Sequence, residues 1–194
     1  MTRNLGRVAM MLLAVLLNAT MAWAEDTSFS GGDGSAKSPY IITTAADWDQ
    51  LSSDVASGNS YSSKFFELNA DITVSTMVGS DGYKFCGHFN GNGKTLTLSY
   101  GTSTQPFDEN YCAPFRYIDG TDIQDLNVSG NIFTNKQFAA GIAGSANGDN
   151  TITNCLVSVD INSASWFTLD GRHLERKPTV KGIYINNGKK VIVK

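Results

Sequence analysis

The 194-residue sequence predicts a mainly β protein: a short parallel solenoid with an N-terminal capping helix and a C-terminal β-hairpin tail. The main observation is a repeated phrase, in which an apolar, β-branched run is followed by a turn of Gly, Asn and Asp. It occurs at residues 65–71, 86–98, 123–130 and 140–159. Repetition of one strand-and-turn unit every ~20 to 30 residues is typical of stacked coils that bury their apolar face against their neighbours.

The N-terminus has the three-part pattern of a secretory signal peptide. Arg3 and Arg7 precede an apolar run over residues 8–17, and a small-residue cleavage pattern ends at Ala24, before Glu25. The run is too short to span a bilayer. We expect residues 1–24 to be removed between Ala24 and Glu25, giving an exported chain.

Charge divides the exported chain in two. Residues 25–165 carry 16 acidic and 6 basic residues, whereas residues 166–194 carry 2 acidic and 7 basic residues. The change predicts a boundary near residue 163, although a basic tail that only aids solubility would give the same pattern. We expect a flexible Gly- and Ser-rich segment over 25–38, a repeat domain over 39–162 and a basic tail over 163–194. The acidic body argues against nucleic acid as a partner.

One helix is predicted, over residues 45–57. Thr44 and Asp47 resemble a capping box, and Trp48, Leu51 and Val55 form one apolar stripe. Placed before a stack of β coils, such a helix would cover the exposed edge of the first coil. Docking of a partner protein needs the same stripe and stays open.

Residues 90–93, Asn-Gly-Asn-Gly, are interpreted as a turn. A phosphate-binding loop needs a following helix N-terminus, and here an alternating strand follows. Later asparagines suit the corners of a solenoid: Asn127, Asn131, Asn147, Asn150 and Asn154.

The chain has three cysteines, Cys86, Cys112 and Cys155. Their spacing does not determine a pairing, and each fits a small hydrophobe beside an apolar run. The cysteines are far apart in sequence and the only histidines are His88 and His173, so neither a metal site nor a cofactor is predicted.

The tail is strongly β-patterned. Residues 166–169 are a strand candidate, residues 170–171 a turn, and residues 182–194 a hairpin around Asn187 and Gly188. Three short strands make a small core, so the tail is not expected to be an independent enzyme or receptor.

The body resembles secreted repeat proteins of Gram-negative anaerobes that carry GLUG-type motifs and right-handed parallel β-helix repeats. The resemblance rests on residues 39–48, 66–72, 89–96, 141–144 and 151–155. At Ile142 and Ala143 this sequence departs from the usual Leu and Val of the motif. The resemblance implies a right-handed β-helix.

The tail is similar to the C-terminal sorting domains recognised by the type IX secretion system, or to shorter relatives of them. The resemblance implies passage across the outer membrane, with release or attachment at the cell surface, or periplasmic retention if the tail is not recognised. The matching positions include Leu169, Asp170, Gly171, Arg172, Gly182, Ile183, Tyr184, Lys189, Lys190 and Val191.

The first function hypothesis is a non-enzymatic, adhesin-like surface or secreted protein that binds a glycan or host protein. A solenoid offers a long face of side chains, and aromatic rings stack on sugars. The candidate rings are Tyr61, Tyr83, Tyr100, Tyr111 and Tyr117.

Two alternatives stay open. One is a polysaccharide lyase or hydrolase, which would need clustered carboxylates; the best cluster is Asp119, Asp122 and Asp125 with Arg116. The other is a self-associating structural protein or a shortened repeat protein, since no obvious polar cap follows Ile161.

Overall fold

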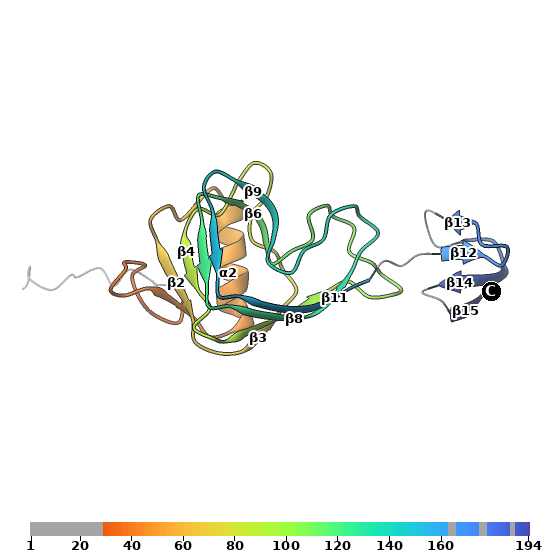
Figure 1. The fold of residues 1–194 in the computed structure, drawn as a ribbon, viewed down its shortest axis with the longest axis horizontal. Helices are drawn as coiled ribbons and strands as arrows, with labels where there is room; N and C mark the ends of the chain where they lie inside the picture. The colour runs from red at the N-terminus through yellow and green to blue at the C-terminus, as the bar shows by residue number, and fades with distance from the viewer. Residues whose placement is uncertain (1–28, 163–165, 175–177, 187–188) are drawn as a thin grey trace, which may run out of the picture.

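The computed structural model describes residues 29–162, 166–174, 178–186 and 189–194. The chain is mainly β and forms a parallel β-solenoid of about 4 turns with one short helix, which confirms the predicted fold class. Figure 1 shows the strands of successive coils side by side along the body. The predicted signal peptide and the Ala24–Glu25 cleavage site lie outside the described residues.

Two parallel sheets form most of the solenoid wall. The first sheet has the order β1-β2-β4-β7-β10 and the second the order β11-β8-β5-β3. The strands of the first sheet are β1 (Tyr40–Ile42), β2 (Phe65–Leu68), β4 (His88–Asn90), β7 (Asp122–Gln124) and β10 (Thr151–Thr153). Those of the second are β3 (Ile72–Val74), β5 (Thr95–Tyr100), β8 (Asn127–Phe133) and β11 (Leu156–Asn162).

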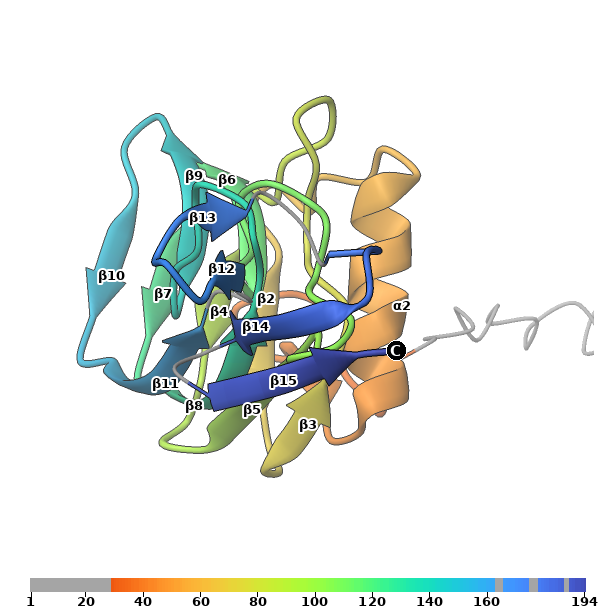
Figure 2. The ribbon, with the colours of Figure 1, turned by 90° about the vertical axis from the view of Figure 1, so that its right-hand side faces the viewer.

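A third wall is formed by β6 (Phe115–Asp119) and β9 (Ala143–Asn147), which pair in parallel. Isolated parallel bridges join β6 to Val78 and Phe85 of the preceding coil. Each coil therefore passes through the same walls in the same direction, and Figure 2 shows these walls together with the helix.

The core consists of side chains that occupy the same register position in successive coils. In the first sheet, Phe66 pairs with Phe89 and Phe89 with Ile123, and all three are buried. In the second, Leu96 pairs with Val128, and both are again buried. Because alternate residues of a strand face opposite sides, the residues between them are left on the outer surface.

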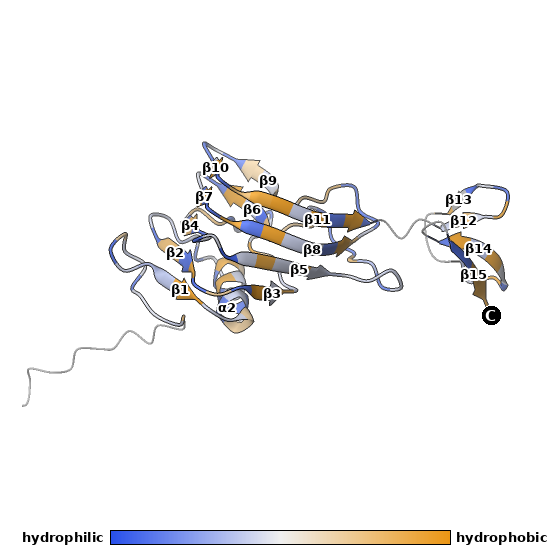
Figure 3. Cartoon of the chain, turned by 60° about the horizontal axis from the view of Figure 1, so that its bottom comes forward, coloured by the Kyte–Doolittle hydropathy of each residue, from blue (hydrophilic) through white to orange (hydrophobic). Residues whose placement is uncertain are grey.

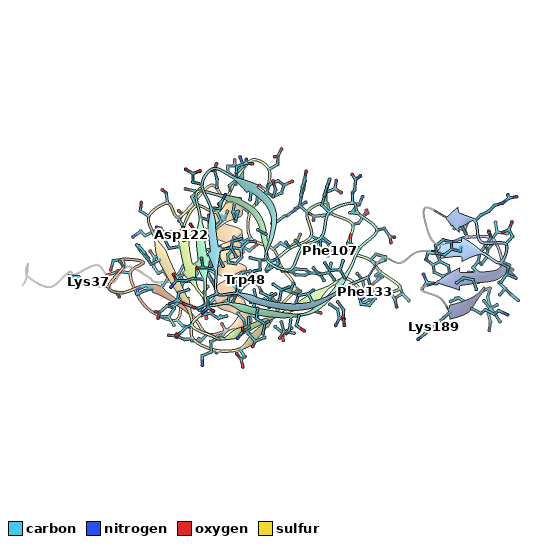
Figure 4. All side chains as sticks on the ribbon, in the orientation of Figure 1. Lys37, Trp48, Phe107, Asp122, Phe133 and Lys189 are labelled. Atoms are coloured by element: carbon cyan, nitrogen blue, oxygen red, sulfur yellow. The ribbon has the colours of Figure 1, made fainter. Side chains whose placement is uncertain are left out.

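Helix α2 (Ala45–Ala56) matches the predicted helix and its capping box. The Thr44 hydroxyl accepts from the Asp47 N–H at 3.2 Å, and the Asp47 carboxylate accepts from the Thr44 N–H at 2.9 Å. Trp48 is fully buried, with its ring 6.0 Å from Phe89 and 5.3 Å from Phe115. Figure 4 labels Trp48 within the body, so the helix contributes its apolar stripe to the core.

The N-terminal edge of the first sheet is covered. The N–H of Ser30 donates to the carbonyl of Ile41, and the N–H of Ile41 donates to the carbonyl of Gly31. Phe29 is buried, with its ring 5.5 Å from that of Phe66. The sequence predicts a flexible segment over residues 25–38. In the described part of this segment, residues 29–31 make these contacts and so cover an edge of β1 that would otherwise be unpaired.

The corner between the first and second sheets repeats in three coils. Asn92, Asp125 and Asn154 have φ values of 51°, 52° and 50°, a left-handed conformation that Asn and Asp tolerate better than most residues. The Asn92 amide donates to Asn69 Oδ1 at 3.0 Å, and the Asn154 amide donates to the Asp125 carboxylate. The Gly- and Asn-rich phrase therefore forms the corner between the two sheets.

The tail forms an antiparallel sheet with the order β13-β12-β14-β15. Its strands are β12 (Trp166–Thr168), β13 (His173–Leu174), β14 (Gly182–Asn186) and β15 (Lys189–Val193). The predicted hairpin corresponds to β14 and β15, and its predicted turn residues, Asn187 and Gly188, lie outside the described part of the chain.

Candidate functional site

A groove of about 350 Å³ lies on the outer face of the first sheet. Its floor is formed by β2, β4 and β7, and one end is bounded by Ala36 and Pro39. The lining residues are Ala36, Pro39, Phe65, Phe66, Glu67, His88, Phe89, Asn90, Asp122 and Gln124. The volume falls within the range of pockets that hold small ligands.

The first row of outward side chains is Phe65, His88 and Asp122, which are register partners on neighbouring strands. The rings of Phe65 and His88 are stacked, with centroids 4.4 Å apart and planes 15° apart. The Nδ1 atom of His88 lies 2.8 Å from Oδ2 of Asp122. The His88 and Asp122 side chains are 35% and 48% exposed, so a ligand can reach this row from solvent.

The second row, two residues further along the strands, is Glu67, Asn90 and Gln124. It adds two amides and a carboxylate beside the stacked rings. Among the described residues that line the groove, Glu67 and Asp122 are carboxylates and none is Lys or Arg. The groove thus combines an aromatic surface with hydrogen-bond donors and acceptors and an acidic rim.

A second hollow of about 490 Å³ lies along the polar corner. It is lined by Asn90, Asn92, Gly93, Asp125, Asn127, Asn154, Cys155 and Leu156. Much of its polar chemistry is already satisfied: Asn127 Nδ2 donates to the Gly93 carbonyl at 2.8 Å, and Asn154 donates to Asp125. These contacts hold one coil to the next, so the groove on the first sheet is the better candidate.

Three of the five candidate tyrosines lie inside the protein: Tyr61, Tyr100 and Tyr117. The Tyr61 hydroxyl donates to Asp54 at 2.5 Å, and that of Tyr100 donates to the Thr76 carbonyl at 2.8 Å. Burial raises the pKa of each of these phenols, with the hydrogen bond to Asp54 adding to the rise at Tyr61. Protein neighbours therefore occupy the ring faces that a sugar would need.

The other two candidates differ from each other. Tyr111 is half-buried and stacks on Phe138, with ring centroids 4.8 Å apart and planes 5° apart. Tyr83 is 52% exposed. Neither lines the groove on the first sheet.

The candidate acidic cluster does not gather around one point. Asp119 is the last residue of β6. Asp122, on β7, faces His88 on β4, and Asp125 accepts a hydrogen bond from Asn154 at the corner. Arg116 pairs with Glu109 and lies over the ring of Tyr117, 5.6 Å from its centroid. Only Asp122 of this set lines the groove.

The three cysteine thiols are unpaired, with Cys112 buried and Cys86 and Cys155 half-buried. Burial raises the pKa of the Cys112 thiol to about 11 and also raises that of Cys86. Within residues 29–162 and the described parts of the tail, no three His, Cys, Asp or Glu side chains gather as metal ligands would.

The sorting-like residues lie on the tail sheet and its turn. Leu169, Asp170, Gly171 and Arg172 form the turn after β12, where the Gly171 N–H donates to the Thr168 carbonyl at 3.0 Å. Gly182, Ile183 and Tyr184 lie on β14, and Lys189, Lys190 and Val191 on β15.

Sequence reasoning missed the pairing of Phe65 with His88. A usable signal exists: in the aligned repeats Phe-Phe-Glu, His-Phe-Asn and Asp-Ile-Gln, the middle residue is apolar and the flanking residues share the outer face. Aligning these strands by their buried position would have gathered both outward rows.

Comparisons with known proteins show one partial likeness. The chain is 29% identical over 149 residues, 71% of its length, to a protein of Evansella cellulosilytica named as a Gly-rich membrane protein. The matched region spans 16% of that relative's length. No protein-family model and no solved structure matches the chain. Among the described residues, no helix has the length and apolar character to cross a membrane.

Proposed function

We propose that this protein is a non-enzymatic binding scaffold that holds a neutral saccharide in the groove on the first sheet. The observation that carries the proposal is the stacked Phe65–His88 pair, which lies beside the amides and carboxylates of both outward rows. The exposed parts of the two aromatic rings can contact the C–H groups of a sugar, and flanking polar groups bond to its hydroxyls. The parallel walls hold these side chains on short, paired strands.

The charge of the groove favours a neutral ligand. Glu67 and Asp122 would oppose the carboxylate of a uronic or sialic acid, since like charges repel in a partly desolvated site. Asn90 and Gln124 each offer one acceptor and two N–H donors, which suits a hydroxyl-rich ligand.

The test is a glycan array followed by titration calorimetry with the best neutral oligosaccharide. Phe65→Ala should weaken binding at least tenfold, because it removes the stacking surface. Tyr83→Ala is the matched control: it removes an exposed aromatic ring outside the groove and should bind as the parent chain does. No neutral glycan above background, or equal affinity in Phe65→Ala, would overturn the proposal.

A hydrolase is the second candidate, because Glu67 and Asp122 are two carboxylates on one groove and glycoside hydrolysis uses such a pair. Incubating the bound oligosaccharide with the protein and measuring reducing ends separates the two functions. Turnover that disappears in both Glu67→Gln and Asp122→Asn would make the protein an enzyme. Unchanged oligosaccharide supports a binding role.

We further propose that the scaffold is a GLUG-like β-helix protein displayed outside the cell. The support is the signal-like N-terminus, the resemblance of the tail to a sorting domain, and a relative named as a membrane protein, which is compatible with a surface location. The partners would be the export machinery and the type IX system. A reporter fused to residues 163–194 should reach the surface of a type IX-competent host, and retention in the periplasm would count against the tail's role.

A further inference from the structure

The last coil of the solenoid leaves its inward-facing side chains uncovered. Ile152, Val157 and Ile161 are 44%, 47% and 51% exposed. Their register partners one coil earlier, Ile123, Val128 and Ile132, are 0%, 1% and 0% exposed. The same positions thus change from core to surface because no described coil follows. Figure 3 shows β11 beside β8 with hydrophobic residues along it.

The two ends of the solenoid differ. At the N-terminal end, residues 29–31 bond to β1, and the apolar stripe of helix α2 is fully buried. At the C-terminal end, β11 is the outermost strand of the second sheet and β10 of the first. Natural edge strands are usually protected by Lys, Pro or a bulge. β11 reads Leu-Val-Ser-Val-Asp-Ile-Asn, with Asp160 as its one charge.

Among the described strands, β11 pairs only with β8, which leaves its other edge open. The Leu156 N–H donates to the Leu126 carbonyl at 3.0 Å, and the Asn162 carbonyl accepts from the Thr134 N–H at 2.9 Å. Even-numbered residues of β11 therefore direct their backbone groups toward β8. Since these groups alternate along a strand, Val157, Val159 and Ile161 direct theirs to the open edge.

We propose that the open end of β11 is a dimerisation surface for a second copy of this chain, paired antiparallel about a two-fold axis at Val159. In that register, Val157 of one copy lies opposite Ile161 of the other, which joins two exposed apolar side chains. Asp160 lies opposite Ser158, so the two carboxylates do not face each other. The same residues contact on both sides, as a closed two-fold interface requires.

The covered N-terminal end limits the assembly to two copies. A head-to-tail filament would need an open edge at both ends of the solenoid. At the N-terminal end, residues 30 and 31 bond to β1 of the first sheet, and helix α2 packs against β3, the edge strand of the second sheet. The dimer places two saccharide grooves on one particle, but its formation does not depend on the proposed ligand.

The first experiment is sedimentation of the chain expressed from its complete coding sequence, with Val157→Lys and Leu156→Lys as a matched pair. Both positions are exposed and apolar on β11, but Val157 faces inward and Leu156 outward. The parent and Leu156→Lys should form dimers, and Val157→Lys should dimerise at least tenfold more weakly. A parent that stays monomeric, including one covered by its own tail, overturns the proposal. So does a dimer unaffected by Val157→Lys, or growth into long polymers.

A second pair of variants tests the register without altering the apolar end. Ser158 is exposed and outward, so Ser158→Asp and Ser158→Lys should both fold as the parent chain does. Opposite Asp160 of the second copy, Ser158→Asp should weaken the dimer and Ser158→Lys should strengthen it, both less at high salt. Equal effects from the two variants would overturn the antiparallel register.

Discussion

The Nδ1 atom of His88 lies 2.8 Å from the Oδ2 atom of Asp122, although 34 residues separate them in sequence. Their strands, β4 and β7, are neighbours in the first sheet, and the two residues are register partners. The contact fixes the imidazole that stacks on Phe65, so one hydrogen-bonding contact sets the geometry of the aromatic surface.

This contact leads to a prediction on binding. Asp122→Asn keeps the shape of the side chain but weakens a hydrogen bond to a carboxylate, which is worth ~1.5 to 3 kcal/mol at most. We expect saccharide affinity to fall about threefold to tenfold by calorimetry, because the His88 ring is held less firmly. Thr151→Ala, next in the same row but outside the groove, is the control. Unchanged affinity in Asp122→Asn would show that the pair does not position the ring.

The capping carboxylate of helix α2 predicts an effect on stability. Asp47 Oδ2 accepts from the N–H groups of Thr43 and Thr44 and from the Ser30 hydroxyl, at 2.9, 2.9 and 2.8 Å. We expect Asp47→Asn to lower the free energy of unfolding by about 1 to 2 kcal/mol, the range of a lost helix cap. Urea unfolding at pH 7 measures it. Asp49→Asn, with one exposed hydrogen bond to Thr76, should cost less.

The same residue predicts a pH dependence. Burial alone would raise the pKa of Asp47, but the hydrogen bonds from Thr43, Ser30 and Thr44 outweigh it and hold the pKa below its usual value of 3.8. The carboxylate therefore stabilises the fold fully above pH 3.8, and this contribution is lost as the pH falls through the lowered value. The difference in free energy of unfolding between the parent chain and Asp47→Asn should become smaller in acid. A difference that stays constant with pH would contradict this prediction.

The exposed last coil predicts unequal costs for one substitution in two coils. Ile132→Ala removes a fully buried side chain and should cost ~2 to 5 kcal/mol. Ile161→Ala, at the register partner that is half exposed, should cost less than half as much. Denaturant curves at a protein concentration that favours monomer give both values. Equal costs would mean that another part of the chain covers the end.

Two glycines predict unequal sensitivities to an added methyl group. A Cβ at Gly130, where φ is +100°, would lie 2.2 Å from the Leu98 carbonyl oxygen. At Gly93, where φ is +68°, it would meet no atom within 4 Å. Gly130→Ala should therefore destabilise the fold by more than ~3 kcal/mol and Gly93→Ala by about 1 kcal/mol. Thermal unfolding of both variants compares the two losses of stability. A smaller fall in melting temperature for Gly130→Ala than for Gly93→Ala would contradict the prediction.

Local features could be predicted from the sequence because their partners are near in the chain. The capping box joins Thr44 and Asp47, three residues apart, and the stripe of helix α2 follows one turn after another. The hairpin of β14 and β15 is likewise formed by adjacent segments. The repeated phrase also indicated the parallel solenoid, since its apolar positions recur coil by coil.

The third wall was harder to predict. The repeated phrases at residues 65–71, 86–98, 123–130 and 140–159 do not include β6, Phe115–Asp119. That strand exists because Val78 and Phe85 of the preceding coil and β9 of the next pair with it. Tyrosine burial follows the same rule: Tyr100 is covered by residues distant in sequence, which composition cannot reveal.

By itself, the sequence determined the coil as a unit: which residues turn and where the helix begins. Only the tertiary structure decided which side chains of neighbouring coils come into contact and which are covered. It brought Phe65, His88 and Asp122 into one outward row and covered Val128 while leaving Val157 half exposed. The physical reason is that burial and side-chain contact in a solenoid depend on the register and presence of a neighbouring coil, and neither is encoded in a single repeat.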